Sequence, residues 1–281
     1  EWTNPHDHAV ATAAPAKNER LVEELEASVG GRIYTGDAVP VCLTWDDFGL
    51  ACRDKLLPLL IERKLPSTLA LSSRAYDSSS TAIYDGYVGT QWSDFNDTPD
   101  YITVANHSAT HGNADTDELV RMEVETGLEE LQAALPKKKI RTFILPAALY
   151  YPNFRGASPD EWATMPGRRI LENHAFTTGA WQVTDTSGSY PMTGNRPPQG
   201  LIRCWVDGSA GVAPVKKLIE QAAAKKHGVI VGGHPGKFDE PGLATTSQIA
   251  EFLDWLVAEQ EAGRVRVLTL EQWACAQYGT L

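Results

Sequence analysis

The stretch VPVCLTWDDFGLACRDKLLPLLIERKLPSTLALSS, residues 39–73, decides the fold. Its opening run VPVCLTW (39–45) is apolar and short, which is typical of a buried strand. Residues 50–64 have a helical pattern, although Pro58 removes one backbone donor and is expected to kink the helix. STLALSS (67–73) predicts a second strand. A strand, a helix and a second strand in this order form the unit from which parallel sheets and barrels are built.

The same alternation continues to the end of the chain. Further strands are predicted at 101–107, 141–146, 175–183, 201–206, 229–234 and 265–270, and further helices at about 159–174, 215–226 and 246–261. Asp115 and Glu118 have capping-box spacing and predict the start of another helix, which ends at Pro136. About seven strands interleaved with helices predict an α/β fold of barrel type, in which chemistry gathers at the carboxyl ends of the strands.

The first residues differ from the rest of the chain. A stretch of small residues is followed by an acidic helical pattern, ERLVEELEAS, that ends at Gly30 and Gly31. We therefore expect residues 1–36 to form an N-terminal extension, a partly helical linker, and residues 37–281 to form the catalytic domain.

Composition excludes several classes of protein. The 25 Lys and Arg residues against 36 Asp and Glu give a net charge of −11, which argues against a nucleic-acid partner. Apolar runs are far shorter than a membrane span needs, so no span is expected. The four cysteines lack a CxxC pair and are predicted to be free thiols, mostly in the core: Cys42, Cys52, Cys204 and Cys275.

Reactive side chains follow three of the predicted strands. Asp46 and Asp47 come after the first strand, His107 and His111 follow the strand at 101–107, and His234 ends the strand at 229–234. Because the carboxyl ends of parallel strands meet at one edge of the sheet, we expect these five side chains to converge.

The two histidines at i and i+4 can aim their imidazoles at one point, and neutral imidazole is a good ligand for zinc. Asp47 would complete a three-ligand site with an open position for water. Asp46 could then accept a proton from the metal-activated water, and His234 could protonate the leaving group. The alternative for each motif is structural: a turn or helix cap for the two acids, a polar loop for His107 and His111, and a hydrogen-bonded strand end for His234.

Three stretches, VCLTWDDFG, NHSATHG and VIVGGHPG, resemble motifs of the polysaccharide deacetylase family, carbohydrate esterase family four, and occur in the same order as those motifs. The resemblance covers about residues 38–275 and implies a distorted (β/α) barrel that uses a divalent metal, most commonly zinc, with cobalt or nickel as alternatives. It implies these roles: Asp46 as base, Asp47, His107 and His111 as metal ligands, and His234 as general acid. Gly232 departs from the pattern, since the family usually has leucine there.

Two further departures concern supporting residues. The arginine of the family's third motif is missing, and Ile144 stands in its place. Arg203 and Arg141 are the candidates to replace it. For the aspartate that steadies the acidic histidine, Asp185 and Asp207 are both open.

The resemblance implies a hydrolase that removes acetyl groups, N-acetyl rather than O-acetyl, from an amino-sugar polysaccharide. A backbone amide near Ala147 would help the metal to hold the oxyanion. Aromatic residues of an insertion at 74–99 could stack on sugar rings or pin the loop to the barrel: Tyr76, Tyr84, Tyr87 and Trp92.

Two other functions stay open: a C–N hydrolase acting on a small amide or ureide, and a non-catalytic polysaccharide-binding domain with a retained metal site. The suspected substrate implies an extracellular, cell-surface or virion-surface location. The sequence fixes neither the glycan and its linkage nor the oligomeric state.

Overall fold

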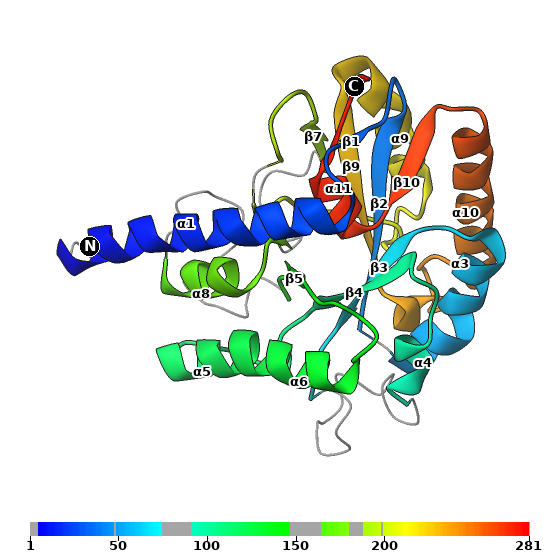
Figure 1. Cartoon of the computed structure of the whole chain (residues 1–281). Helices are drawn as coiled ribbons and strands as arrows, with labels where there is room; N and C mark the ends of the chain where they lie inside the picture. Colours follow the sequence, from blue (N-terminus) through cyan, green and yellow to red (C-terminus); the bar gives the residue numbers. More distant parts are fainter. Residues whose placement is uncertain are drawn as a thin grey trace.

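The computed structural model describes residues 5–47, 49–74, 91–146, 164–179, 188–197 and 199–280, with side chains from residue 16 onward. Within these residues a nine-stranded sheet forms the centre of the molecule (Figure 1). Its strands are β2 (Val39–Asp46), β3 (Ser67–Leu71), β4 (Ile102–Asn106), β5 (Thr142–Ile144), β6 (Phe176–Thr178), β7 (Ser189–Pro191), β8 (Cys204–Trp205), β9 (His227–Gly233) and β10 (Val265–Leu268). A separate pair consists of β1 (Ile33–Tyr34) and β11 (Ala276–Gln277).

The sheet is mostly parallel and curls on itself. Its order is β6-β5-β4-β3-β2-β9-β7, with β8 on β9 and β10 on the first half of β2. A parallel bridge between Thr178 and Leu201 joins β6 to the segment that leads into β8, so the two edges of the curl meet. Strands β2 to β6, β8 and β9 are parallel, while β7 is antiparallel to β9. The predicted α/β fold, a distorted (β/α) barrel with about seven parallel strands, is confirmed.

Helices cover the outside of the sheet (Figure 1). Those before β6 are α1 (Pro5–Ser28), α2 (Gly49–Ala51), the π-helical turn η1 (Cys52–Leu56), α3 (Leu57–Arg63), α4 (Ser93–Asn96), α5 (Asp117–Arg121), the π-helical turn η3 (Met122–Thr126), α6 (Gly127–Ala134) and α8 (Met165–Asn173). Those after β8 are α9 (Ala213–Lys225), the 3₁₀ turn η5 (Pro235–Lys237), α10 (Thr246–Glu261) and α11 (Leu270–Ala274).

The predicted helix at 50–64 is divided by the turn η1. Pro58 has no N–H to donate to the carbonyl of Asp54, four residues earlier. The N–H of Leu57 instead bonds to the carbonyl of Cys52, five residues earlier, which makes this turn π-helical. The expected distortion is therefore present, and α3 starts afresh with Pro58 in its first turn.

The predicted cap of α5 is wrong by one residue. Thr116, and not Asp115, has the extended backbone of an N-cap, and its hydroxyl accepts a hydrogen bond from the N–H of Leu119 at 3.2 Å. Glu118 therefore lies inside the first turn and closes no capping box. The helical region ends at Ala134, as expected ahead of Pro136.

Small side chains fill the inside of the barrel. Cys42, Ala70 and Ala105 are fully buried there and pack with Ile144 and Ile230. A second apolar cluster lies between the sheet and the outer helices.

Helix α1 extends well beyond the predicted acidic pattern and lies along α8 (Figure 1). Asn18 donates from Nδ2 to the carbonyls of Leu171 and His174, at 3.1 and 2.9 Å, and Leu25 is buried. The boundary between an extension at 1–36 and a catalytic domain stays a prediction. Among the helices that the structure describes, none is long and apolar enough to cross a membrane.

A buried acid on α11 predicts a pH-dependent stability. Burial raises the pKa of Glu271 to about 7, with Arg141 opposing, so the folded protein binds a proton that the unfolded chain has lost. The contribution of Glu271 to stability is therefore greatest at low pH and falls as pH rises towards 7. We expect Glu271→Gln to stabilise the protein by about 2 to 3 kcal/mol more at pH 8 than at pH 5. Urea unfolding of the wild type and the variant at pH 5 and pH 8 measures this effect. A variant that is stabilised by the same amount at both pH values would contradict the prediction.

Candidate active site

The two acids after β2 point in different directions because the chain turns sharply between them. Asp46 is the last residue of β2, and Asp47 has a φ of 59°, in the left-handed region that few non-glycine residues adopt. The N–H of Asp47 donates to the carbonyl of Ala70 at 3.2 Å, which holds this turn against β3. Both side chains are buried, at 2 % and 6 % exposure.

The loop after β4 brings the two histidines together. Ser108 and His111 have φ values of 72° and 57°, so the chain forms a tight loop and no helical turn. The side chain of Asn106 accepts a hydrogen bond from the N–H of Ser108, whose hydroxyl accepts one from the N–H of His111. As a result the imidazole rings of His107 and His111 lie 5.0 Å apart.

Asp47, His107 and His111 form a cluster with the dimensions of a metal site. Asp47 Oδ1 lies 3.6 Å from His107 Nε2, and Asp47 Oδ2 lies 3.7 Å from His111 Nε2. One ligand atom from each residue falls within 4.8 Å of the others. Ligand atoms held about 2.1 Å from a tetrahedral zinc ion lie roughly 3.4 Å apart, which these distances approach.

The chemistry of this cluster also fits a divalent cation. Asp47 Oδ1 and His107 Nε2 are buried and lack a hydrogen-bond partner among the described residues, an arrangement that costs free energy unless another group satisfies them. His107 Nδ1 lies 2.7 Å from the carbonyl of Ile144. Because a carbonyl only accepts, Nδ1 carries the proton, and the lone pair of Nε2 faces the cluster.

The protonation states favour metal binding as well. Burial lowers the pKa of His107 below its ordinary value and that of His111 to about 4, so both rings are neutral at physiological pH. Burial raises the pKa of Asp47, with His107 opposing. A cation among these three side chains would favour the ionised carboxylate and leave both imidazoles as ligands.

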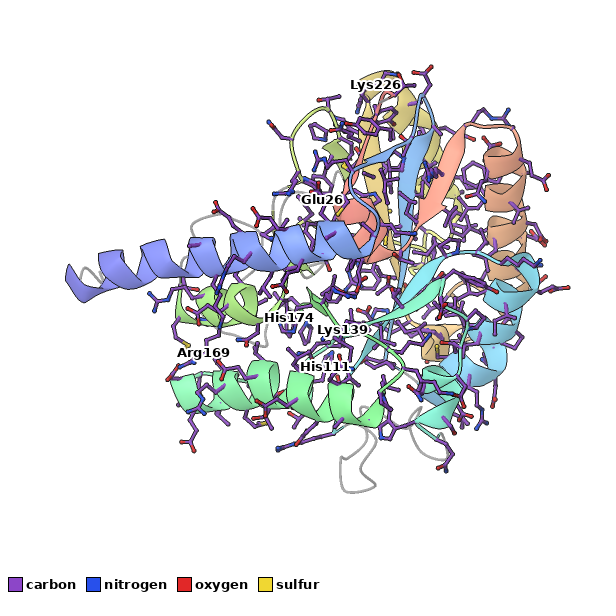
Figure 2. The ribbon with its side chains drawn as sticks, viewed as in Figure 1. Glu26, His111, Lys139, Arg169, His174 and Lys226 are labelled. Carbon is purple, nitrogen blue, oxygen red and sulfur yellow. The ribbon has the colours of Figure 1, made fainter. Side chains whose placement is uncertain are left out.

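The loop that carries His107 and His111 is held by residues that the sequence did not indicate. Glu123, on the π-helical turn η3, is buried and accepts hydrogen bonds from the N–H and hydroxyl of Thr110. Asn106 donates to the carbonyl of Val124 at 3.0 Å and lies 3.2 Å from Nε2 of His174. Burial lowers the pKa of His174 to about 4, so this ring is neutral and accepts. Figure 2 shows it between α8 and the loop that carries His111.

We expect Gly127→Ala to disturb this loop. A Cβ on Gly127 would lie 2.8 Å from the backbone nitrogen of Ala109, closer than a Cβ approaches backbone. Alanine normally favours a helix over glycine by about 1 kcal/mol, but here the clash dominates. The variant should bind zinc at least about tenfold more weakly, as calorimetry would show. Gly208→Ala, whose Cβ meets open space, is the control; equal affinities for the two variants would contradict the prediction.

Arg203 holds Asp46 in a buried, two-bond ion pair. Its Nη1 and Nη2 each donate to one carboxylate oxygen at 2.7 Å, and Nη1 also donates to Thr44 Oγ1. Burial opposes ionisation of Asp46, but the Arg203 guanidinium together with His107 outweighs it and keeps the carboxyl pKa below its ordinary value. Of the two candidates, Arg203 is the one that contacts Asp46, whereas Arg141 lies 3.6 Å from Glu271.

His234 pairs with Asp207. Asp207 Oδ2 accepts from the ring Nδ1 of His234 at 2.7 Å and from its backbone N–H at 2.8 Å. Asp207 thereby fixes the orientation of the His234 ring through Nδ1. The ring of Trp205 stacks on that of His234, with centroids 4.7 Å apart and planes 8° from parallel. Asp185, the other candidate, lies outside the described residues.

Several other sequence predictions also fall outside the described residues: Tyr76, Tyr84, Tyr87 and the backbone amide near Ala147. Trp92 is described, and its ring packs edge-on against Phe95 with centroids 6.4 Å apart. This contact ties Trp92 to the core cluster.

No protein-family model and no curated protein matches this chain. The solved structures that it resembles include polysaccharide deacetylases and other proteins of the CE4 family. A putative polysaccharide deacetylase from Mycobacterium smegmatis is 13% identical and superimposes with a TM-score of 0.51, over 85% of this chain and 90% of the other.

Two further structures superimpose less closely. The catalytic domain of a peptidoglycan N-acetylglucosamine deacetylase from Eubacterium rectale is 14% identical, with a TM-score of 0.44 over 82% of this chain and 88% of the other. A CE4-family pseudoenzyme from Bacillus anthracis is 16% identical, with a TM-score of 0.47 over 86% and 70%. The resemblance is therefore one of fold: the chain has the (β/α) barrel of the polysaccharide deacetylases.

Proposed function

We propose that this protein is a metal-dependent deacetylase of the carbohydrate esterase family four, acting on an amino-sugar polysaccharide. The observation that carries the proposal is a pair of buried atoms that face each other beside His111, Asp47 Oδ1 and His107 Nε2, neither of which has a hydrogen-bond partner among the described residues. Next to them lie an ionised acid, Asp46, and an oriented imidazole, His234. Zinc is the metal that these ligands suit best, with cobalt or nickel as alternatives.

A divalent cation bound by the three ligands would supply a Lewis acid that lowers the pKa of water and polarises the acetyl carbonyl. Asp46 is the base, since its carboxylate is ionised and its Oδ2 lies 3.8 Å from His107 Nε2, beside the ligand cluster. Arg203 holds both carboxylate oxygens and so fixes the direction in which Asp46 accepts the proton.

His234 is the acid. Asp207 holds Nδ1, so Nε2 delivers the proton to the departing nitrogen. An amine leaves poorly unless it is protonated, whereas an alcohol requires this help less. The His234–Asp207 pair therefore supports N-acetyl over O-acetyl substrates.

Two observations support this function over the alternatives. Enzymes of this fold that hydrolyse small cyclic amides tend to lose the metal ligands, and here all three are present. The missing third-motif arginine would favour a non-catalytic binding domain, but Arg203 supplies the same charge to Asp46. A polysaccharide substrate in turn supports a location outside the cell or on a cell or virion surface.

Acetate release tests the proposal. The metal-loaded chain should release acetate from N-acetylglucosamine oligomers or peptidoglycan faster than from acetylxylan. Asp46→Asn should lower kcat by about 10² to 10⁴ because the base is lost while the ligands stay. Absence of acetate from all three substrates would overturn the proposed function. Equal release by wild type and variant would overturn the assignment of the base.

A further inference from the structure

The segment Arg203–Asp207 places three side chains on one side of the chain at β8. Residues at i, i+2 and i+4 of an extended segment point the same way, and here they are Arg203, Trp205 and Asp207. Arg203 holds the base Asp46, and Asp207 holds the acidic histidine. Trp205 stands between the two supports.

The ring of Trp205 contacts both halves of the site. The guanidinium carbon of Arg203 lies 4.6 Å from its centroid, and the His234 ring is stacked 4.7 Å from it. A cation or an aromatic ring on the face of an indole is attracted to it, and such contacts favour one side-chain orientation over others. The indole of Trp205 therefore restrains both Arg203, which pairs with the base, and His234, which is the acid.

Gly232 makes room for this ring. A Cβ at position 232 would lie 3.1 Å from both Cε3 and Cζ3 of Trp205, tighter than ordinary van der Waals contact. Trp205 is paired with Gly232 across β8 and β9, so the indole occupies the space that a side chain at position 232 would take. This contact accounts for a glycine at the position where the family usually has leucine.

Trp205 is also not an ordinary core residue. It is only partly buried, and its Nε1 makes no hydrogen bond within the described part of the chain. The indole therefore acts through its ring faces, and those faces meet Arg203 and His234.

We propose that Trp205 is a positioning residue that fixes Arg203 and His234 relative to each other, and so sets the distance between the base and the acid. The inference rests on the proposed function, since it concerns the same two catalytic groups. A base and an acid that serve one carbonyl must be held to within a fraction of an ångström, and a displacement of about 1 Å can lower the rate a hundredfold.

Two substitutions of Trp205 test the proposal by kinetics. Trp205→Leu should lower kcat at least about tenfold and leave KM within about twofold, because orientation is lost while substrate contacts stay. Trp205→Phe keeps an aromatic face and should retain kcat within about threefold. The matched control is Trp255→Leu on α10, where the indole also stacks on a ring, Phe252, and also carries a cation, Lys216. This control should leave both constants unchanged.

A second readout does not depend on activity. In the wild type the Trp205 ring current should shift the His234 ring-proton signals upfield in an NMR spectrum, with His234→Gln identifying those signals. The shift should vanish in Trp205→Leu, persist in Trp205→Phe and stay unchanged in Trp255→Leu.

Three results would overturn the positioning role: a Trp205→Leu variant with wild-type kcat, a rise in KM alone, or His234 signals that do not move. A wild type that releases no acetate would instead defeat the proposed function, and the NMR comparison would still decide whether the Trp205 ring lies against that of His234.

Discussion

Arg203→Met is expected to abolish nearly all deacetylation, lowering kcat by about 10² to 10⁴. The Asp46 carboxylate is 2 % exposed and has Arg203 as its two-bond partner. Removing the guanidinium leaves an uncompensated buried charge, which costs about 3 to 5 kcal/mol or is avoided by protonation of the acid. If the acid is protonated, it no longer accepts a proton at neutral pH; if it stays ionised, it loses the two hydrogen bonds that fix its direction. Initial rates of acetate release and urea unfolding measure the two effects.

Two control variants separate the charge from its geometry. Arg203→Lys keeps the charge but not the two-bond fork, so its activity should fall between those of Arg203→Met and the wild type. Arg141→Met removes the other candidate arginine, which is paired with Glu271, and should leave kcat unchanged. Activity of Arg203→Met within about threefold of wild type would contradict the role of the ion pair.

His234→Gln is expected to lower kcat on N-acetyl substrates by about 10² to 10⁴ while largely sparing an aryl acetate. A phenolate with a low pKa leaves without protonation, whereas an amine does not, so only the amide requires the acid. The comparison uses 4-nitrophenyl acetate and an N-acetylglucosamine oligomer with the same enzyme preparation.

Asp207→Asn should follow the same pattern more weakly, because the His234 ring stays but the partner that orients Nδ1 is weakened. Equal losses on both substrates for His234→Gln would indicate general damage to the site and contradict its role as the acid. Unchanged rates on the amide would contradict it too.

The central cluster could be anticipated because it depends on local sequence and one topological rule. Asp46, Asp47, His107 and His111 lie at or just after the ends of β2 and β4, and the carboxyl ends of parallel strands meet at one edge. The structure brings these residues together as expected, with the tight turns at Asp47 and Ser108 providing the final approach. Their catalytic and metal-binding roles stay predictions.

The supporting residues could not be chosen from sequence alone. Arg203 reaches Asp46 from a position 157 residues away, and nothing in the local pattern distinguishes it from Arg141. Glu123 supports the histidine loop through a π-helical turn, and the sequence pattern there predicts only an ordinary helix. The cap at Thr116 differs from the expected Asp115 because both residue types are good caps, so backbone geometry decides.

Metal binding tests the central claim most directly. After zinc loading and removal of free metal, elemental analysis of the wild type should give close to one equivalent of zinc per chain, and Asp47→Asn or His111→Ala should give far less. X-ray absorption should show nitrogen and oxygen neighbours about 2.0 to 2.2 Å from the bound zinc. Less than half an equivalent in the wild type, or equal loading of the wild type and the ligand variants, would contradict the account.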